Sequence, residues 1–182
     1  MQLERGKWNM RKTKKRGGNV HSETDRLEIA GITWDFAPFG LVFMAKKFLD
    51  AAKTVVAQEA QLPAQQWHPV GKYLACHSIE LSLKAFLALK GERLAGVKGF
   101  GHDLSDLLQK ANKQKFDELV VLSAEERSEI LKASPYYNQK VFEYPSLPEA
   151  VQAYPGDPMV PYLLSAAEKL VDTLYELCQA AA

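Results

Sequence analysis

Apolar residues recur along the chain mostly at helical spacing, and the first clear run follows the segment Gly31–Phe39. Its members lie three or four positions apart, which places them on one side of a helix. The pattern predicts a helix that lasts to about Ala60 and ends at Leu62-Pro63. We expect its core face to consist of Leu41, Met44, Phe48, Ala52 and Val55.

The second predicted helix, at about Val70–Lys90, is apolar on most of its circumference. A helix with several apolar faces is typical of the centre of a domain, where neighbouring elements cover it on more than one side. Gly91 stands where a left-handed residue is expected to end the helix. We therefore predict that this helix is the buried centre of the fold, followed by a glycine-rich loop at Glu92–Gly101.

Capping patterns indicate where two more helices begin. Asp103 as N-cap, with Asp106 three positions later, predicts the start of a third helix. Ser123 and Glu126 have the spacing of a capping box and predict the start of a fourth helix. We expect the fourth helix to stop before Pro135, because proline disrupts the interior of a helix.

The last predicted helix spans about Met159–Ala180, with Asp157 as N-cap and Pro158 at its first position. No segment shows sustained alternation with period two, so no strand is predicted. Amphipathic helices joined by short loops predict an all-α fold, namely an antiparallel four-helix bundle with an additional short helix.

Charge is distributed unevenly along the chain. Residues 1–20 contain 7 basic residues and 1 acidic residue, a net charge of +6, whereas the other 162 residues contain 16 basic and 21 acidic residues, a net charge of −5. The start has no apolar periodicity, so residues 1–30 are predicted to be a basic flexible arm, and residues 31–182 a single helical domain. The arm either binds RNA phosphates or is a solvated tail, and we favour the tail.

The composition is that of an ordinary globular domain, with 47% hydrophobic and 25% charged residues. No run of 18 apolar residues occurs, so no membrane span is predicted, and the start lacks the apolar region of a secretory signal. Cys76 and Cys178 have no metal-ligand spacing and suit a reducing compartment. These features predict a cytoplasmic protein that does not associate with membranes.

Polar residues follow one face of the second predicted helix. Tyr73, His77, Glu80 and Lys84 are spaced by 4, 3 and 4 positions, and Glu80 precedes Lys84 in the order that favours an ion pair. The apolar faces beside them predict partial burial of the pair, which then needs further hydrogen-bond partners. The face is either a polar pocket for a ligand or an RNA phosphate, or a structural clamp between helices, and we favour the clamp.

His102 stands next to Asp103 at the start of the third predicted helix. An imidazole in this place either caps and fixes the turn, or acts as an acid or base beside a substrate. We favour the turn-fixing role for His102. For His77, we favour a histidine that is satisfied in the core or at an interface.

Two motifs in this region resemble the HEPN superfamily. Residues 80–85 read Glu-Leu-Ser-Leu-Lys-Ala and are followed by Gly91, and residues 101–104 read Gly-His-Asp-Leu. The later Tyr136-Tyr137-Asn138 and Tyr144-Pro145 are similar to a stretch of some members. The resemblance implies a bundle of four or five helices, often dimeric, found in prokaryotic toxin–antitoxin, phage-defence and nucleotidyltransferase-linked systems.

Active HEPN members are metal-independent ribonucleases that carry the pattern Arg-x4–6-His. In this chain only Arg16 and His21 have that spacing, and they lie in the basic arm, while no histidine follows His102. Lys140 or Glu143 stands where the late tyrosine-rich motif would carry an arginine. The resemblance therefore implies a member without the usual ribonuclease residues.

Two hypotheses about function remain. The first, which we favour, is a catalytically silent HEPN-like binding module that forms a homodimer and acts with a nucleic-acid, nucleotide or protein partner, such as a nucleotidyltransferase or an antitoxin. The second is an endoribonuclease toxin with a non-standard set made of Glu80, Lys84 and His102.

The sequence contains no phosphate-binding loop, no zinc-ligand spacing and no supported dinucleotide motif, so we predict no metal and no cofactor. We expect a dimer contact in the segment Lys140–Pro161, which is rich in tyrosine and proline. The predicted ligand- or partner-binding residues are Tyr73, His77, Glu80, Lys84, His102, Asp103, Tyr137, Asn138 and Lys140.

Overall fold

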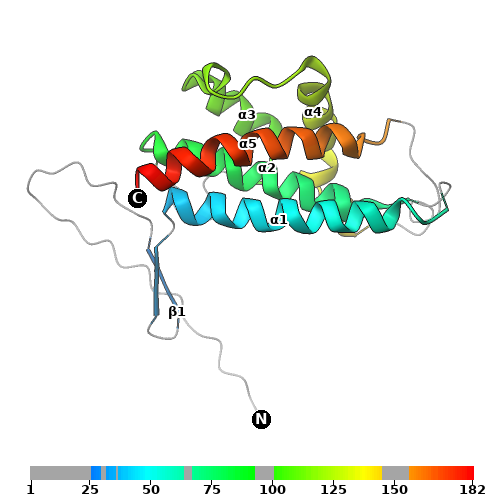
Figure 1. Ribbon diagram of the computed structural model, residues 1–182, viewed down its shortest axis with the longest axis horizontal. Helices are drawn as coiled ribbons and strands as arrows, with labels where there is room; N and C mark the ends of the chain where they lie inside the picture. Colours follow the sequence, from blue (N-terminus) through cyan, green and yellow to red (C-terminus); the bar gives the residue numbers. More distant parts are fainter. Residues whose placement is uncertain (1–25, 30–31, 36, 64–66, 93–100, 145–155) are drawn as a thin grey trace, which may run out of the picture.

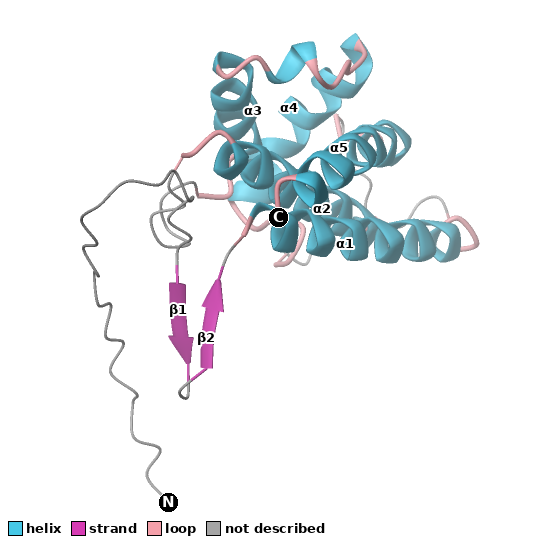
Figure 2. Ribbon diagram, turned by 60° about the vertical axis from the view of Figure 1, so that its left-hand side comes forward, coloured by secondary structure: helices cyan, strands magenta, loops and turns pink. Residues whose placement is uncertain are grey.

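A computed structural model shows a body made of α-helices, preceded by a small β-hairpin (Figures 1 and 2). It describes residues 26–29, 32–35, 37–63, 67–92, 101–144 and 156–182. In chain order, these contain β1 (Arg26–Ile29), β2 (Ile32–Asp35), α1 (Pro38–Glu59), α2 (Pro69–Leu89), α3 (Leu104–Lys113), the short 3-10 helix η1 (Phe116–Glu118), α4 (Ala124–Asn138) and α5 (Val160–Ala180).

Helix α2 lies at the centre of the body. Helices α1 and α5 pack against it and against each other, while α3 and α4 also contact α2. Figure 1 shows that α1 runs in the direction opposite to both α2 and α5. The helical body confirms the predicted all-α class, and its contacts are compatible with a bundle.

The central position of α2 confirms the prediction made from its apolar circumference. Thirteen of its 21 residues are buried, among them Ile79, Leu83 and Phe86 of the predicted apolar stripe. Gly91 follows the helix with a φ of 81°, a left-handed conformation that glycine adopts without steric strain. Burial of α2 on several sides also explains why its polar residues must find partners inside the protein.

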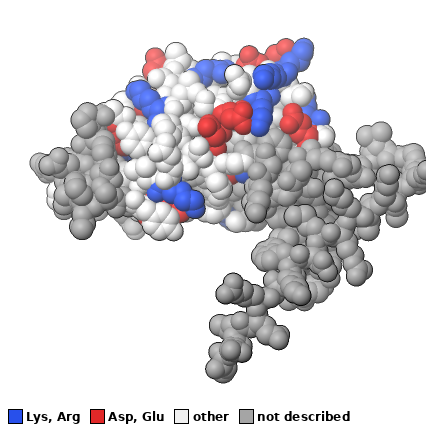
Figure 3. All heavy atoms as spheres, turned by 180° about the vertical axis from the view of Figure 1, so that it is seen from behind, with Lys and Arg blue, Asp and Glu red and all other residues white. Residues whose placement is uncertain are grey.

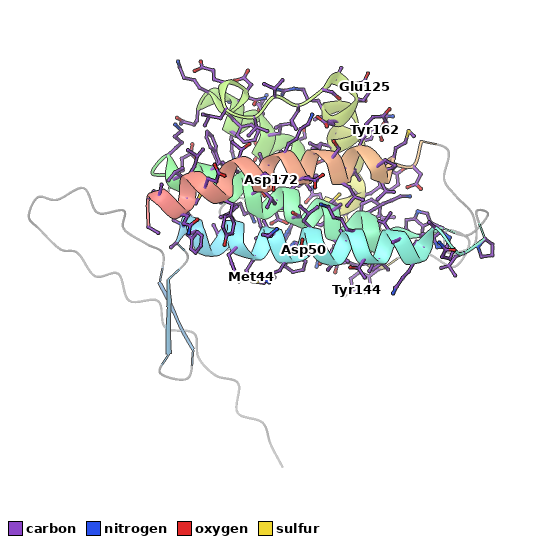
Figure 4. All side chains as sticks on the ribbon, viewed as in Figure 1. Met44, Asp50, Glu125, Tyr144, Tyr162 and Asp172 are labelled. Carbon is purple, nitrogen blue, oxygen red and sulfur yellow. The ribbon has the colours of Figure 1, made fainter. Side chains whose placement is uncertain are left out.

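The core face of α1 differs from the predicted one. The helix buries Val42, Ala45, Leu49 and Ala52, whereas Met44 of the predicted face is 45% exposed. Figure 4 shows Met44 on the side of α1 away from α5. The buried face is therefore rotated by about one residue from the expected face.

Small residues explain this rotation, because they let α1 and α2 approach closely. The hydroxyl of Ser78 on α2 donates a hydrogen bond to the backbone oxygen of Ala45 on α1, at 2.8 Å. At Gly71, an added Cβ would collide with the side chain of Val56. The contact between the two helices thus depends on small side chains, which hydrophobic periodicity does not single out.

Capping interactions start α3 and α4 as predicted. The Asp103 carboxylate accepts a hydrogen bond from the backbone N–H of Asp106. Both hydrogen bonds of the Ser123–Glu126 capping box are present. The prediction that α4 stops before Pro135 is wrong, because the helix continues through this proline to Asn138. One further turn places Tyr137 on the helix, where its side chain is buried.

The start of α5 also differs from the prediction. Met159, rather than Asp157, is the N-cap, and the proline of the first turn is Pro161. The Asp157 carboxylate instead forms an ion pair with Lys72 of α2. The backbone N–H of Met159 donates to the Glu129 carboxylate at 2.8 Å, so a side chain from α4 satisfies the start of α5.

The β-hairpin is an element that the sequence analysis did not predict. Strands β1 and β2 pair antiparallel, and the register joins Leu27 to Trp34 and Ile29 to Ile32. Figure 2 shows the two strands standing apart from the helices. β1 lies within the segment predicted to be a flexible arm, and β2 within the segment 31–39, where no strand was predicted. The alternation of apolar and polar residues in these two short segments is the signal that was missed.

Several predictions concern residues outside the described ranges. These are residues 1–25 of the basic arm, including Arg16 and His21, the middle of the glycine-rich loop at 93–100, and the part of the proline-rich segment at 145–155. Within the described ranges, none of the helices combines the length and the apolar character that crossing a membrane requires.

The capping box gives a test of the fold. The substitution Ser123→Ala removes the oxygen that accepts from the Glu126 N–H, so we expect the free energy of unfolding to fall by about 1 kcal/mol and the Tm by about 2–4 °C. Thermal and chemical denaturation measure both quantities. The control Ser123→Thr keeps a hydroxyl and should retain most of the stability; an alanine variant as stable as the native protein would contradict the capping role.

Candidate functional site

The Glu80 carboxylate, which is 1% exposed, joins three parts of the fold. It accepts hydrogen bonds from Lys84 of α2 and from the hydroxyl of Tyr137 at the end of α4. The Nδ1 atom of His102, which precedes α3, lies 3.2 Å from either carboxylate oxygen. His77, one turn before Glu80, places its Nδ1 3.5 Å from the carboxylate. The structure therefore brings together five of the predicted site residues.

Helix geometry accounts for half of this arrangement, because His77, Glu80 and Lys84 share one face of α2 at spacings of three and four residues. The other half comes from elsewhere in the chain. The turn fixed by the Asp103 cap positions His102, and the last turn of α4 positions Tyr137. The clamp between helices that we favoured for this polar face is consistent with these contacts.

Burial alone would raise the pKa of Glu80, because it removes the charged form from water. Hydrogen bonds from His77, Lys84 and Tyr137, together with the charge of Lys84, outweigh burial and hold the pKa at about 2. Burial and the adjacent Glu80 charge raise the pKa of Tyr137, so its hydroxyl remains protonated. Glu80 is therefore a permanent anion at neutral pH, and Tyr137 is a permanent donor.

These protonation states fix the roles of the two imidazoles. Tyr137 has one hydroxyl proton and donates it to Glu80, so the Nδ1 of His77, 2.6 Å from the Tyr137 oxygen, must be the donor in that contact. A carboxylate accepts only, so the Nδ1 of His102 is also a donor. In both histidines the Nε2 atom is left without a hydrogen-bond partner among the described residues.

Aromatic rings hold the histidines in place. His77 stacks on Tyr73 with an angle of 9° between the ring planes, and it lies nearly perpendicular to the ring of Phe48 of α1, with the centroids 4.3 Å apart. The rings of His102 and Tyr137 are nearly perpendicular, with centroids 6.1 Å apart. Because each ring packs against another ring, the imidazoles are held by packing as well as by hydrogen bonds.

A pocket of about 110 Å³ opens beside this cluster. It is lined by Tyr73, His77, His102, Tyr137, Lys140 and Glu143. His77 is the less accessible of the two histidines, with 22% of its side chain exposed, and His102 is the more accessible, with 49% exposed. Lys140 and Glu143 carry opposite charges, and the Nζ atom of Lys140 lies 3.8 Å from a carboxylate oxygen of Glu143.

The remaining predicted residues have different places. Lys140 lines the pocket, but Asp103 does not, because its carboxylate is used by the Asp106 N–H and by the hydroxyl of Ser134. Asn138 is the last residue of α4 and is exposed outside the pocket lining. Glu143 is a lining residue that the sequence analysis did not propose for binding. Its spacing of three residues from Lys140 is the one signal that could have suggested it.

Other buried carboxylates of the helical body connect neighbouring helices. Glu126 of α4 binds Lys169 and the Ser165 hydroxyl of α5, and Glu129 binds Lys132 and the start of α5. These contacts keep the pKa of each carboxyl below its ordinary value, although burial alone would raise it. Neither residue lines the pocket, whereas three partners or neighbours of Glu80, namely His77, His102 and Tyr137, do.

Among the described residues, no group of three His, Cys, Asp or Glu side chains is arranged to hold a metal ion. Comparison of the chain with protein-family models, with curated proteins and with solved structures found no match. The HEPN resemblance thus stays a prediction from the sequence motifs, and the site must be interpreted from its own chemistry.

The loss of unfolding free energy at acid pH tests whether Glu80 is ionised in the folded protein. Because folding lowers its pKa from 4.5 to about 2, the ionised group adds about 3 kcal/mol of stability above pH 5, and this is lost as the pH falls towards 2. We expect Glu80→Gln to have a smaller loss of unfolding free energy between pH 5 and pH 2 than the native protein. Urea denaturation over that range measures it. Parallel curves for the two proteins would show that Glu80 does not titrate as described.

Proposed function

We propose that this chain is a catalytically silent, HEPN-like binding module that takes RNA or a nucleotide through the pocket beside Glu80. We further propose that its helices form a four-helix bundle with an additional short helix, and that it acts as a homodimer with a toxin–antitoxin or nucleotidyltransferase partner. The binding role and the lack of catalysis rest on the geometry of the site. The HEPN likeness, the toxin–antitoxin setting and the partner rest on the sequence motifs.

The observation that carries the proposal is the saturated, buried state of Glu80. A general acid or base works best with a pKa near the operating pH and must reach the substrate. Glu80 has a pKa of about 2 and is 1% exposed, and its ion-pair partner Lys84 is also buried. Two of the three groups in the alternative ribonuclease set therefore hold the structure and do not face a substrate.

The accessible part of the site has the character of a binding surface. Two tyrosines, two histidines, one lysine and one glutamate line the pocket. Among the described residues, the lining contains no arginine to neutralise the charge of a transition state at phosphorus. On the face drawn in Figure 3, basic and acidic side chains are interspersed, which favours recognition at a defined pocket over a broad basic surface.

An RNA-cleavage assay tests directly whether the protein is a ribonuclease. We expect the purified protein to leave total RNA intact, both with and without EDTA, because no described group pairs a suitable acid with a suitable base. The His102→Ala variant, which removes the most accessible imidazole of the site, is assayed in parallel by gel electrophoresis. Reproducible cleavage by the native protein that disappears in this variant would overturn the silent-module proposal in favour of a ribonuclease.

A further inference from the structure

We propose that the pocket between α2, His102 and the end of α4 is a receptor for a terminal phosphate group, as carried by a mononucleotide or by the end of an RNA strand. This inference rests on the proposed binding function and names the chemical group that the site recognises. It follows from the balance of charges around the pocket, the hydrogen bonds that occupy one nitrogen atom of each histidine, the size of the space and the presence of Lys140 in the lining.

Among the described residues, the fixed charges that line or back the pocket fall into two pairs. Glu80 is paired with Lys84 behind the pocket, and Glu143 lies 3.8 Å from Lys140 at its rim. The hydroxyl groups of Tyr73 and Tyr137 are neutral, because burial and neighbouring carboxylates raise the pKa of each.

Asp103 is next to His102 in the chain, and it caps the positive end of α3. Apart from these pairs and the two tyrosines, the described lining consists of the two histidines, the groups that can add positive charge if they take up a proton together with an anion.

Both histidines present the correct atom for an anion. The Nδ1 atom of each is used by Glu80 or Tyr137, so the Nε2 atom is the one that remains for a ligand. A protonated imidazole with its Nδ1–H held by a carboxylate offers its Nε2–H to an oxyanion as a charge-assisted donor. Two such donors would give the pocket a charge of about +2, which matches the charge of a phosphate monoester.

The size of the pocket favours a terminal group. A volume of about 110 Å³ is less than that of pockets that enclose whole drug-sized ligands, about 300–1,000 Å³. It equals the liquid volume of three or four water molecules, at about 30 Å³ each. A tetrahedral phosphate fits this space, whereas a nucleoside must remain outside. An internal phosphodiester carries a sugar on two sides and is therefore less suited to a pocket backed by a closed cluster of side chains.

Lys140 supplies the lysine of the described lining, and it has a left-handed φ of 60°. Lys115 has the same conformation, with a φ of 64°, and likewise pairs with a glutamate three residues later, Glu118. Lys115 is not part of the pocket lining. The conformation is therefore not specific to the pocket, and Lys115 is a matched control for substitutions of Lys140.

Sulfate is the first probe, because it keeps two negative charges between pH 6 and pH 8. At constant ionic strength, we expect sulfate to shift the NMR signals of the His77 and His102 side chains, and to bind more tightly at pH 6 than at pH 8. Lys140→Gly should weaken binding about tenfold, since it removes one charge-assisted contact, without lowering the Tm. Lys115→Gly should leave the affinity unchanged. Equal weakening by both variants, or no binding, would overturn the proposal.

A gain in affinity provides a test that misfolding cannot mimic. Glu143 is the one acidic side chain in the lining, and the substitution Glu143→Gln removes its repulsion from an anion. We expect this variant to bind sulfate about threefold more tightly than the native protein. Unchanged or weaker binding by a folded Glu143→Gln variant would contradict the assignment of the pocket to an anion.

The source of the phosphate is distinguished by comparing three ligands: inorganic phosphate, a nucleoside monophosphate, and a short RNA with either a 5′-phosphate or a 5′-hydroxyl end. We expect the 5′-phosphorylated RNA to bind more tightly than its 5′-hydroxyl counterpart. Equal binding of the two RNAs with no binding of phosphate would refute the pocket but retain the proposed function. Binding of phosphate with no binding of RNA or nucleotide would refute the proposed function but retain the pocket.

Discussion

The structure depends on the contacts that compensate the negative charge of one buried carboxylate. Glu80 lies on the central helix, almost without exposure, and an unpaired charge in that place would destabilise the fold by several kcal/mol. Lys84, Tyr137 and His102 supply the compensation from α2, from the end of α4 and from the turn before α3. The requirement therefore fixes the relative positions of three segments that lie up to 57 residues apart in the chain.

Much of the helical body could be predicted from local patterns. The capping residues Asp103 and Ser123, and the stop at Gly91, act within a few residues of themselves, so their effect is visible in the sequence. The Glu80–Lys84 pair and the burial of its face follow equally from helical spacing and flanking apolar residues. These features needed no knowledge of which helices meet.

What the sequence could not predict depends on contacts over long distances. The buried face of α1 follows from the close approach of α2 at Gly71 and Ser78, and periodicity of large apolar residues favoured a neighbouring face. Pro135 lies inside α4 because burial of Tyr137 against α2 outweighs the loss of one backbone hydrogen bond. Asp157 could not be excluded as an N-cap without its distant partner, Lys72. The hairpin was missed because each strand is only four residues long.

The same constraint links stability to function. Each histidine of the site lines the pocket, and its Nδ1 atom is held by the Glu80–Tyr137 cluster, whereas its Nε2 atom has no hydrogen-bond partner among the described residues. A side chain whose orientation is already fixed on one edge loses little conformational entropy when a ligand binds the other edge. The buried ion pair that makes Glu80 unsuitable as a catalytic base thus also organises the imidazoles in advance. Under the function that we propose, a fold that places this buried ion pair behind the pocket would hold an anion and would not cleave it.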